Sequence, residues 1–184
     1  MVTFTNKAAK EMQERVSITL GFIGTFHSLC ARILRRDAPH IGLGNDFVIY
    51  DDGDTDVIIK NSMKDMIIKK KLTPSYVKYR ISSAKDNLLS PEKYASFARS
   101  EQDEILAKIY TAYQKKLADN NAVDFDDLIY KTVELFKNNP TVLDRYQETF
   151  QHLLVDEFQD TNAGQYLLAQ MLASKYKNIT VVGD

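Results

Sequence analysis

Short apolar runs rich in β-branched residues occur at the two ends of the chain, and they predict strands there. The runs cover residues 2–5, 18–23, 152–155 and 179–182, and polar residues or glycines interrupt or end them. The first run stops at Asn6, which we expect to cap the helix that follows. Because helical segments separate these strands, the pattern predicts a parallel sheet covered by helices on both faces.

The middle of the chain, from about residue 26 to residue 150, reads as helix throughout. Helix start signals recur at Asp51, Thr73, Ser90, Asp124 and Asn139, three of them followed by proline. Apolar residues at helical spacing predict buried faces within residues 105–117 and 128–136. Aromatic residues spaced in this way are usually buried, so five tyrosines of this region are expected in the core: Tyr76, Tyr79, Tyr94, Tyr110 and Tyr113.

These patterns together predict an α/β core built from residues 1–25 and 150–184, with an all-α insertion at residues 26–149. Two glycines in residues 42–45 make this stretch the expected flexible joint in the first part of the chain. The composition is typical of a globular protein, with 184 residues of which 44% are hydrophobic and 27% charged. A single cysteine, Cys30, excludes an internal disulfide and favours a reducing, cytoplasmic location.

The net charge of −1, taken alone, argues against nucleic-acid binding, but it is an average over two different halves. Residues 1–45 carry six basic and three acidic side chains, whereas residues 101–150 carry six basic and ten acidic ones. A surface for an anion is therefore expected in the first half. Arg32 and Arg36 are four residues apart and share a helix face that suits phosphates, although such a face can also be simply solvated.

The strongest chemical signal is the apolar run at residues 153–155 followed by Asp156 and Glu157. A buried strand of a parallel sheet ends at the edge where such folds bind ligands. There Asp156 could hold Mg²⁺, which prefers oxygen ligands, and Glu157 could deprotonate an attacking water. The alternative is that both acids only stabilise the start of the next helix.

The sequence around these acids resembles the UvrD/Rep/PcrA family of superfamily 1 DNA helicases. Residues 156–162 (DEFQDTN) resemble its Walker B motif, and residues 181–184 (VVGD) resemble the start of the motif that follows. Residues 3–12 (TFTNKAAKEM) and 24–28 (GTFHS) resemble two DNA-contacting motifs. Residues 124–128 (DFDDL) match a signature near the end of the family's helical insertion. These five matches occur in the family's order over nearly the whole chain.

The resemblance implies an ATP-dependent DNA helicase with a RecA-like parallel sheet and 3′-to-5′ polarity. It implies Mg²⁺ and ATP as cofactors, Asp156 as metal ligand, Asp156 and Glu157 at the nucleotide, and Glu157 and Gln159 as catalytic residues. Single-stranded and forked double-stranded DNA are the implied partners. The implied nucleic-acid contacts, together with the basic helix face, are Phe4, Thr5, Asn6, Lys7, Thr25, His27, Arg32 and Arg36.

The comparison with the family also predicts what the chain lacks. No Gly-x-x-x-x-Gly-Lys-Ser/Thr loop occurs in the 184 residues, so we expect a partial sheet without a phosphate loop and no ATPase activity from this chain alone. The phosphate loop and second motor domain are expected in a missing remainder of the same polypeptide. Two alternatives remain, a non-catalytic DNA-binding module and the helicase part of a recombination helicase–nuclease. Asp124 is expected to cap a helix, with Asp126 and Asp127 stabilising its first turn, because no lysine or further glutamate nearby completes a nuclease-like site.

Overall fold

The computed structural model describes residues 1–3, 5–16, 21–64 and 72–184. Within these residues the chain divides into two compact units. We call Met1–Asn45 with Leu128–Asp184 the sheet unit, and Asp46–Asp127 the helical unit. The first boundary falls directly after residues 42–45, where the glycines predict a joint.

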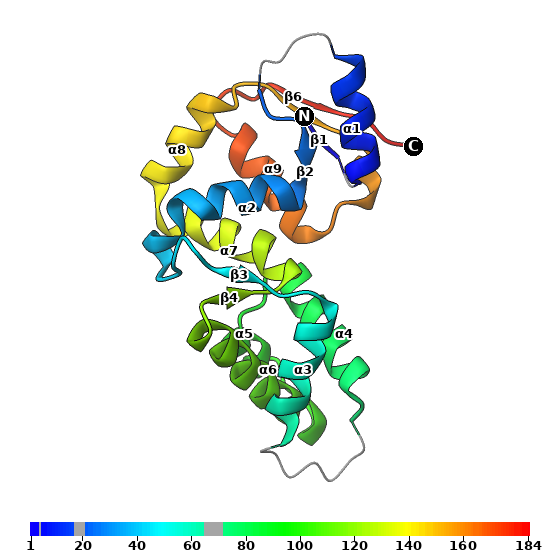
Figure 1. Ribbon diagram of the computed structural model, residues 1–184, viewed down its shortest axis with the longest axis vertical. Helices are drawn as coiled ribbons and strands as arrows, with labels where there is room; N and C mark the ends of the chain where they lie inside the picture. Colours follow the sequence, from blue (N-terminus) through cyan, green and yellow to red (C-terminus); the bar gives the residue numbers. More distant parts are fainter. Residues whose placement is uncertain (4, 17–20, 65–71) are drawn as a thin grey trace. The chain divides into compact units, whose positions relative to one another are not determined.

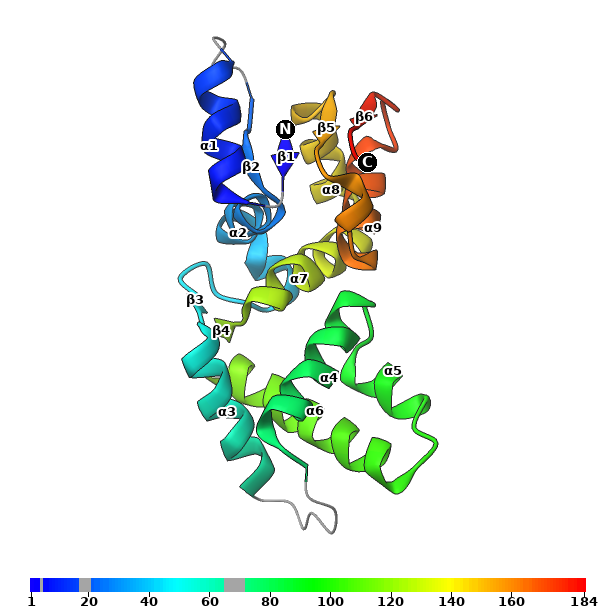
Figure 2. The ribbon, with the colours of Figure 1, turned by 90° about the vertical axis from the view of Figure 1, so that its right-hand side faces the viewer.

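The described part of the sheet unit contains four parallel strands in the order β2-β1-β5-β6, which appear side by side in Figure 2. They are β1 (Val2–Thr3), β2 (Gly24–Thr25), β5 (Leu153–Val155) and β6 (Ile179–Val181). Val2 is opposite Gly24 on one side and Val155 on the other, and Leu153 is opposite Ile179. The predicted parallel sheet is thus confirmed. The second strand lies at Gly24–Thr25 rather than at residues 18–23, of which residues 18–20 lie outside the described part.

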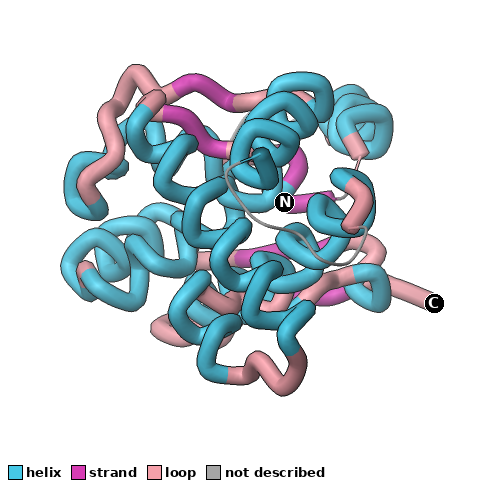
Figure 3. The backbone as a smooth tube through the Cα atoms, turned by 90° about the horizontal axis from the view of Figure 1, so that it is seen from below, coloured by secondary structure: helices cyan, strands magenta, loops and turns pink. Residues whose placement is uncertain are grey.

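Helices pack against the strands of this sheet; Figure 3 draws helices in cyan and strands in magenta. Helices α1 (Asn6–Arg15) and α2 (Phe26–Asp37) pack against β1 and β2, and α9 (Ala163–Ala173) packs against β5 and α8 (Pro140–Thr149). Helix α2 buries Leu29, Cys30, Ile33 and Leu34, which recur every three or four residues as an inward-facing stripe requires. Two short 3₁₀ helices, η1 (Ala38–Ile41) and η2 (Phe158–Asp160), complete the connections.

The compact units do not coincide with the division expected from the sequence. Helices α2 and α8 belong to the sheet unit, although both were expected in the insertion at residues 26–149. The physical reason is their packing, since α2 contacts two strands and α8 contacts α9. A helical pattern in the sequence does not reveal which neighbour the helix covers.

The helical unit is built around one hydrophobic core. Its helices are α3 (Asp52–Lys64), α4 (Pro74–Asp86), α5 (Pro91–Ser96), α6 (Glu101–Asp119) and the first residues of α7 (Phe125–Asn138), and Figure 1 shows them from cyan to green. The prediction of helix throughout is wrong where two short strands form. Strands β3 (Val48–Ile49) and β4 (Ala122–Val123) form a short parallel pair. Two-residue strands carry too little alternation to be predicted from a sequence.

The tyrosines of the helical unit divide between core and surface. Tyr110 and Tyr113 are fully buried and Tyr94 is partly buried, as expected. Tyr76 and Tyr79 are 36% and 67% exposed, so their expected place in the core is wrong. Helix α4 buries Val77 and Ile81 instead, and the Tyr76 hydroxyl lies outside this stripe, where it accepts a hydrogen bond from Arg80 Nη1 (2.8 Å).

Polar side chains begin most of the helices. Thr73 and Ser90 accept hydrogen bonds from backbone amides of α4 and α5, as the start signals predict. The cap of α1 is Thr5 rather than the expected Asn6, because the Thr5 hydroxyl accepts from the Ala8 amide (3.1 Å) and Asn6 is already helical. Among the described helices, none combines the length and the apolar character that a bilayer crossing demands.

Candidate nucleotide and nucleic-acid sites

The carboxylate of Asp156 lies at the carboxyl end of two neighbouring strands. The Asp156 amide donates to the carbonyl oxygen of Val2 (3.1 Å), which continues the pairing of β5 with β1. The side chain is half-buried, and its Oδ2 accepts a hydrogen bond from Thr3 Oγ1 (3.3 Å), a residue of β1. This is the sheet edge at which parallel α/β folds bind ligands.

Glu157 follows with an unusual backbone conformation. Its φ of 51° lies in the left-handed region, which residues other than glycine enter at a cost. The turn leaves the Glu157 side chain exposed, and Oε2 accepts a hydrogen bond from Gln159 Nε2 (2.7 Å). Asp156 and Glu157 therefore differ in their surroundings, with one tied to the sheet and the other presented outward beside an amide.

The two acids do not cap the helix that follows them. Asn162 caps α9, since its Oδ1 accepts from the Gln165 amide (2.9 Å) and Gln165 Oε1 accepts from the Asn162 amide (3.1 Å). Glu157 precedes the 3₁₀ helix η2 without a capping hydrogen bond from its side chain. The alternative reading of these acids as caps of the next α-helix is thus not supported by the geometry.

The donor set at this edge fits a hard divalent cation. Asp156 supplies a carboxylate, Thr3 a hydroxyl oxygen within hydrogen-bond distance of it, and Glu157 a second carboxylate in the adjacent position. Among the described residues there is no group of three or more metal-ligating side chains. Proteins usually hold Mg²⁺ by one or two carboxylates together with substrate phosphates.

The first predicted DNA-contacting segment lies at the start of α1. Thr5, Asn6 and Lys7 are all exposed there, and the Thr5 hydroxyl caps the helix. The first turn of a helix presents backbone amides and a favourable dipole to an anion. Phe4, predicted to lie beside a base, falls outside the described residues.

The second predicted segment lies at the start of α2, and its residues differ in accessibility. Thr25 is only 7% exposed and forms a capping box with Ser28, whose amide donates to Thr25 Oγ1 (3.1 Å). His27 is half-buried, and burial lowers the pKa of its imidazole, so the ring is neutral near pH 7. A neutral His27 can contribute a hydrogen bond but no charge to a phosphate.

Arg32 and Arg36 are exposed on α2, one turn apart. Their neighbour Arg35 is also exposed, and its Nη1 donates to the carbonyl oxygen of Asn45 (3.0 Å). The structure therefore groups the nucleic-acid candidates into exposed residues at the start of α1, exposed arginines of α2, and the buried Thr25 with the half-buried His27 at the start of α2.

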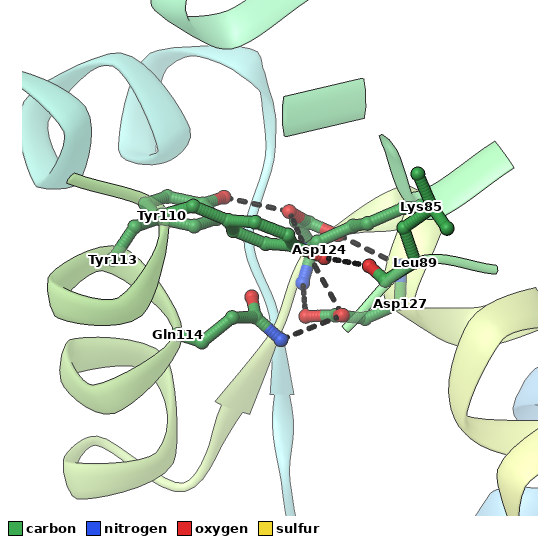
Figure 4. Close-up of polar contacts among 7 residues, drawn as sticks. All are labelled: Lys85, Leu89, Tyr110, Tyr113, Gln114, Asp124 and Asp127. Carbon is green, nitrogen blue, oxygen red and sulfur yellow. Dashed lines mark hydrogen bonds and ion pairs between the residues drawn. The ribbon is translucent and has the colours of Figure 1, made fainter. Parts of the chain in front are cut away.

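A buried charge cluster in the helical unit was missed by the sequence reasoning. Figure 4 shows that Lys85 of α4 lies between Asp124 and Asp127, with Nζ at 2.5 Å from Asp124 Oδ2 and 2.9 Å from Asp127 Oδ1. The Tyr113 hydroxyl also donates to Asp124 (2.6 Å). The expectation that no lysine joins these acids is wrong. The available signal was Lys85 at helical spacing from Val77 and Ile81, on the buried stripe of α4.

Opposing effects determine the ionisation of this cluster. Burial alone would lower the pKa of Lys85, but the charges of Asp124 and Asp127 outweigh it and raise that pKa. Burial would likewise raise the pKa of Asp124, but the Lys85 charge and its hydrogen bond lower it. The Asp127 amide donates to Asp124 Oδ1 (2.8 Å), so the expected capping role of Asp124 is confirmed beside the ion pair.

Comparison with known proteins identifies relatives over the whole chain. Residues 1–184 match the UvrD/REP helicase N-terminal domain. The chain is 46% identical, over 190 aligned positions, to proteins named ATP-dependent DNA helicase PcrA from Bacillus subtilis (strain 168) and Staphylococcus aureus (strain Mu50). It is 45% identical to the protein of the same name from Staphylococcus epidermidis. All of this chain is covered in each case, but only 26% of each relative. The chain thus spans about a quarter of the length of these proteins.

Proposed function

Because the chain belongs to the UvrD/REP helicase family, we propose that it supplies the Walker B acids and part of the DNA-binding surface of an ATP-dependent DNA helicase. In this proposal the whole polypeptide couples hydrolysis of Mg²⁺-ATP to 3′-to-5′ movement on single-stranded DNA and to unwinding of a forked duplex. The observation that carries it is the pair Asp156 and Glu157 at the end of β5, beside β1.

The two acids have separate roles in this proposal. Asp156 would hold Mg²⁺, with the Thr3 hydroxyl orienting its carboxylate. When bound, the ion would neutralise charge on the phosphates of ATP. Glu157 accepts the proton of the attacking water, and the Gln159 amide, which donates to Glu157 Oε2, holds that carboxylate in place. Their different surroundings support the assignment, because a metal ligand gains from rigid support and a general base needs access to water.

DNA binding is assigned to the sheet unit. The exposed residues Thr5, Asn6 and Lys7 would contact phosphates at the start of α1, and Phe4 would lie beside a base. Thr25 and His27 would contribute at the start of α2, where the low exposure of Thr25 favours its backbone over its side chain. Arg32 and Arg36 would add charge on the same helix.

In this proposal, the phosphate loop and the second motor domain of the helicase lie outside these 184 residues. The sequence contains no phosphate loop, so we propose that residues elsewhere in the polypeptide supply it, together with a second motor domain. Residues 1–25 and 150–184 would form part of one RecA-like motor domain, and residues 26–149 its helical insertion. Phosphoryl transfer depends mainly on positioning and charge stabilisation, so the chain alone should not hydrolyse ATP.

The proposal is tested with Glu157→Gln in a polypeptide that joins this chain to a phosphate loop and a second motor domain. We expect DNA-stimulated ATP hydrolysis to fall at least 100-fold, because the general base is lost, while binding of ATP is retained. Glu148→Gln is the matched control, since Glu148 is an exposed carboxylate of α8 that pairs with Lys175 and should leave hydrolysis unchanged. A wild-type rate in Glu157→Gln would refute the assigned role.

A measurement on the 184-residue chain separates the classes of function. DNA-stimulated ATP hydrolysis by the purified chain would contradict the need for an external phosphate loop. Fluorescence anisotropy with forked DNA over a salt series tests the DNA-binding surface, because phosphate contacts give a steep negative slope of log K against log salt. Strong binding by the chain, with wild-type ATP hydrolysis in Glu157→Gln, would favour a non-catalytic DNA-binding module.

A further inference from the structure

Gly183 follows β6 and lies against the turn that carries the proposed catalytic residues. The Phe158 amide donates to the carbonyl oxygen of Val182 (2.9 Å), and the Val182 amide donates to the carbonyl oxygen of Val155 (2.9 Å). These two bonds tie the end of β6 to the chain on both sides of Asp156 and Glu157. The backbone around Gly183 is therefore held at a fixed distance from the turn.

The space beside Gly183 is filled by the side chain of Gln159. A Cβ atom built on Gly183 would lie 2.2 Å from Gln159 Oε1 and 3.3 Å from Gln159 Cδ. Carbon and oxygen atoms that are not bonded do not approach so closely, since optimal separations are about 3.5 Å or more. The Gln159 amide thus occupies the volume that any side chain at position 183 would need.

That amide group forms the hydrogen bond from Gln159 Nε2 to Glu157 Oε2 (2.7 Å). Because Oε1 and Nε2 belong to one planar group, an atom that displaces Oε1 also moves Nε2. The end of a glutamine side chain moves at little cost, so the clash would be relieved by moving the amide rather than by unfolding the turn. The effect of a side chain at position 183 therefore falls on the Glu157 hydrogen bond.

We propose that Gly183 is a positioning residue, whose missing side chain leaves the space from which the Gln159 amide holds the Glu157 carboxylate. The catalytic consequence rests on the function proposed above. The role is steric rather than conformational, because the φ of Gly183 lies outside the left-handed range and alanine can adopt this backbone. A contact of 3.3 Å between the added Cβ and the Phe158 amide nitrogen requires a shift of only a few tenths of an ångström, roughly the gap to ordinary van der Waals contact.

The geometry is tested on the 184-residue chain with Gly183→Ala. We expect its melting temperature to stay close to that of the wild type, while the side-chain amide signals of Gln159 shift in the ¹H–¹⁵N NMR spectrum. Glu157→Ala, which removes the acceptor, should shift the same signals. Gly53→Ala is the matched control, since its added Cβ would approach only the Asp51 carboxylate at 3.2 Å, and it should leave the Gln159 signals unchanged. Unchanged Gln159 signals in Gly183→Ala would overturn the proposal.

A second variant covers the case in which Gly183→Ala does not fold. Gln159→Ala/Gly183→Ala removes the atoms that would clash, so it should fold like the Gln159→Ala variant. If the double variant is also unfolded, Gly183 is needed for another reason and the proposal is wrong.

The consequence for catalysis is measured by a double-mutant cycle in the longer polypeptide. Gly183→Ala should lower kcat for ATP hydrolysis roughly 3- to 10-fold, the change expected from the loss of one hydrogen bond, with little change in KM. Gln159→Ala should have the same effect, and the double variant should be no slower than either single one. If the reductions in kcat caused by the two single substitutions multiply in the double variant, the proposal is wrong. A wild-type polypeptide without ATPase activity would refute the proposed function instead, and the NMR result would still decide the geometry.

Discussion

Removal of the Lys85 ammonium group gives the sharpest test of the energetics of the helical unit. The substitution Lys85→Met keeps the length of the side chain and removes its charge. The side chains of Lys85 and Asp127 are fully buried and that of Asp124 is 7% exposed, so water cannot replace the lost partner. Removing one partner of a buried ion pair costs about 3–5 kcal/mol, a large share of the 5–15 kcal/mol that typically stabilises a protein.

Urea unfolding at pH 7 measures this loss. With a slope of about 2 kcal/mol per molar urea, the midpoint of Lys85→Met should fall by roughly 1.5–2.5 M. Lys78→Met is the matched control on the same helix, because Lys78 forms its ion pairs with Asp52 and Asp56 near the surface. Such pairs are worth at most about 1 kcal/mol.

The dependence of stability on pH supplies an independent signature. The pKa of Asp124 is lowered in the folded protein, so its contribution is present above the unfolded pKa and is lost as the pH falls through the folded value. In Lys85→Met the buried carboxylates keep no cation, and their pKa values should rise instead. Protonation then removes the unpaired buried charges. The difference in free energy of unfolding between the wild type and Lys85→Met should therefore shrink between pH 7 and pH 4. A deficit under about 1 kcal/mol at pH 7, or one that grows on acidification, would refute the reasoning.

Two further predictions concern α2 in the sheet unit. Burial raises the pKa of the Cys30 thiol to about 12, and the side chain has no exposed surface, so Cys30 should react with a thiol reagent at pH 8 only after unfolding; fast labelling of the folded chain would contradict this burial. Thr25→Ala should lower the free energy of unfolding by about 1 kcal/mol in denaturant titrations, because it removes the cap of α2. Thr25→Ser keeps the capping hydroxyl, so it should retain most of this stability. Equal losses in the two variants would show that the methyl group matters rather than the hydroxyl.

The features that the sequence predicted correctly depend on neighbours along the chain. The apolar run before Asp156, the caps Thr73 and Ser90, and the parallel sheet follow from local spacing and residue type. The match to the UvrD/REP helicase N-terminal domain also confirms the resemblance read from five short motifs. The exact ends of the helices were predicted less accurately than the helices themselves. The cap of α1 is Thr5 rather than Asn6, and the sequence does not distinguish them because both residue types are good caps.

Contacts between residues far apart in the sequence decided which side chains meet and which are buried. Lys85 lies 39 positions before Asp124, and only the fold of the helical unit brings the Lys85 ammonium group to Asp124 and to Asp127 at the start of α7. Tyr79 and Tyr110 look alike in the sequence, but the direction in which each helix faces exposes one and buries the other. Gly183 and Gln159 are likewise neighbours only because β6 pairs with β5. The sequence by itself determined the elements and the chemical groups they carry, through interactions within a few residues. Only the tertiary structure decided which groups meet, since that depends on how whole helices and strands pack.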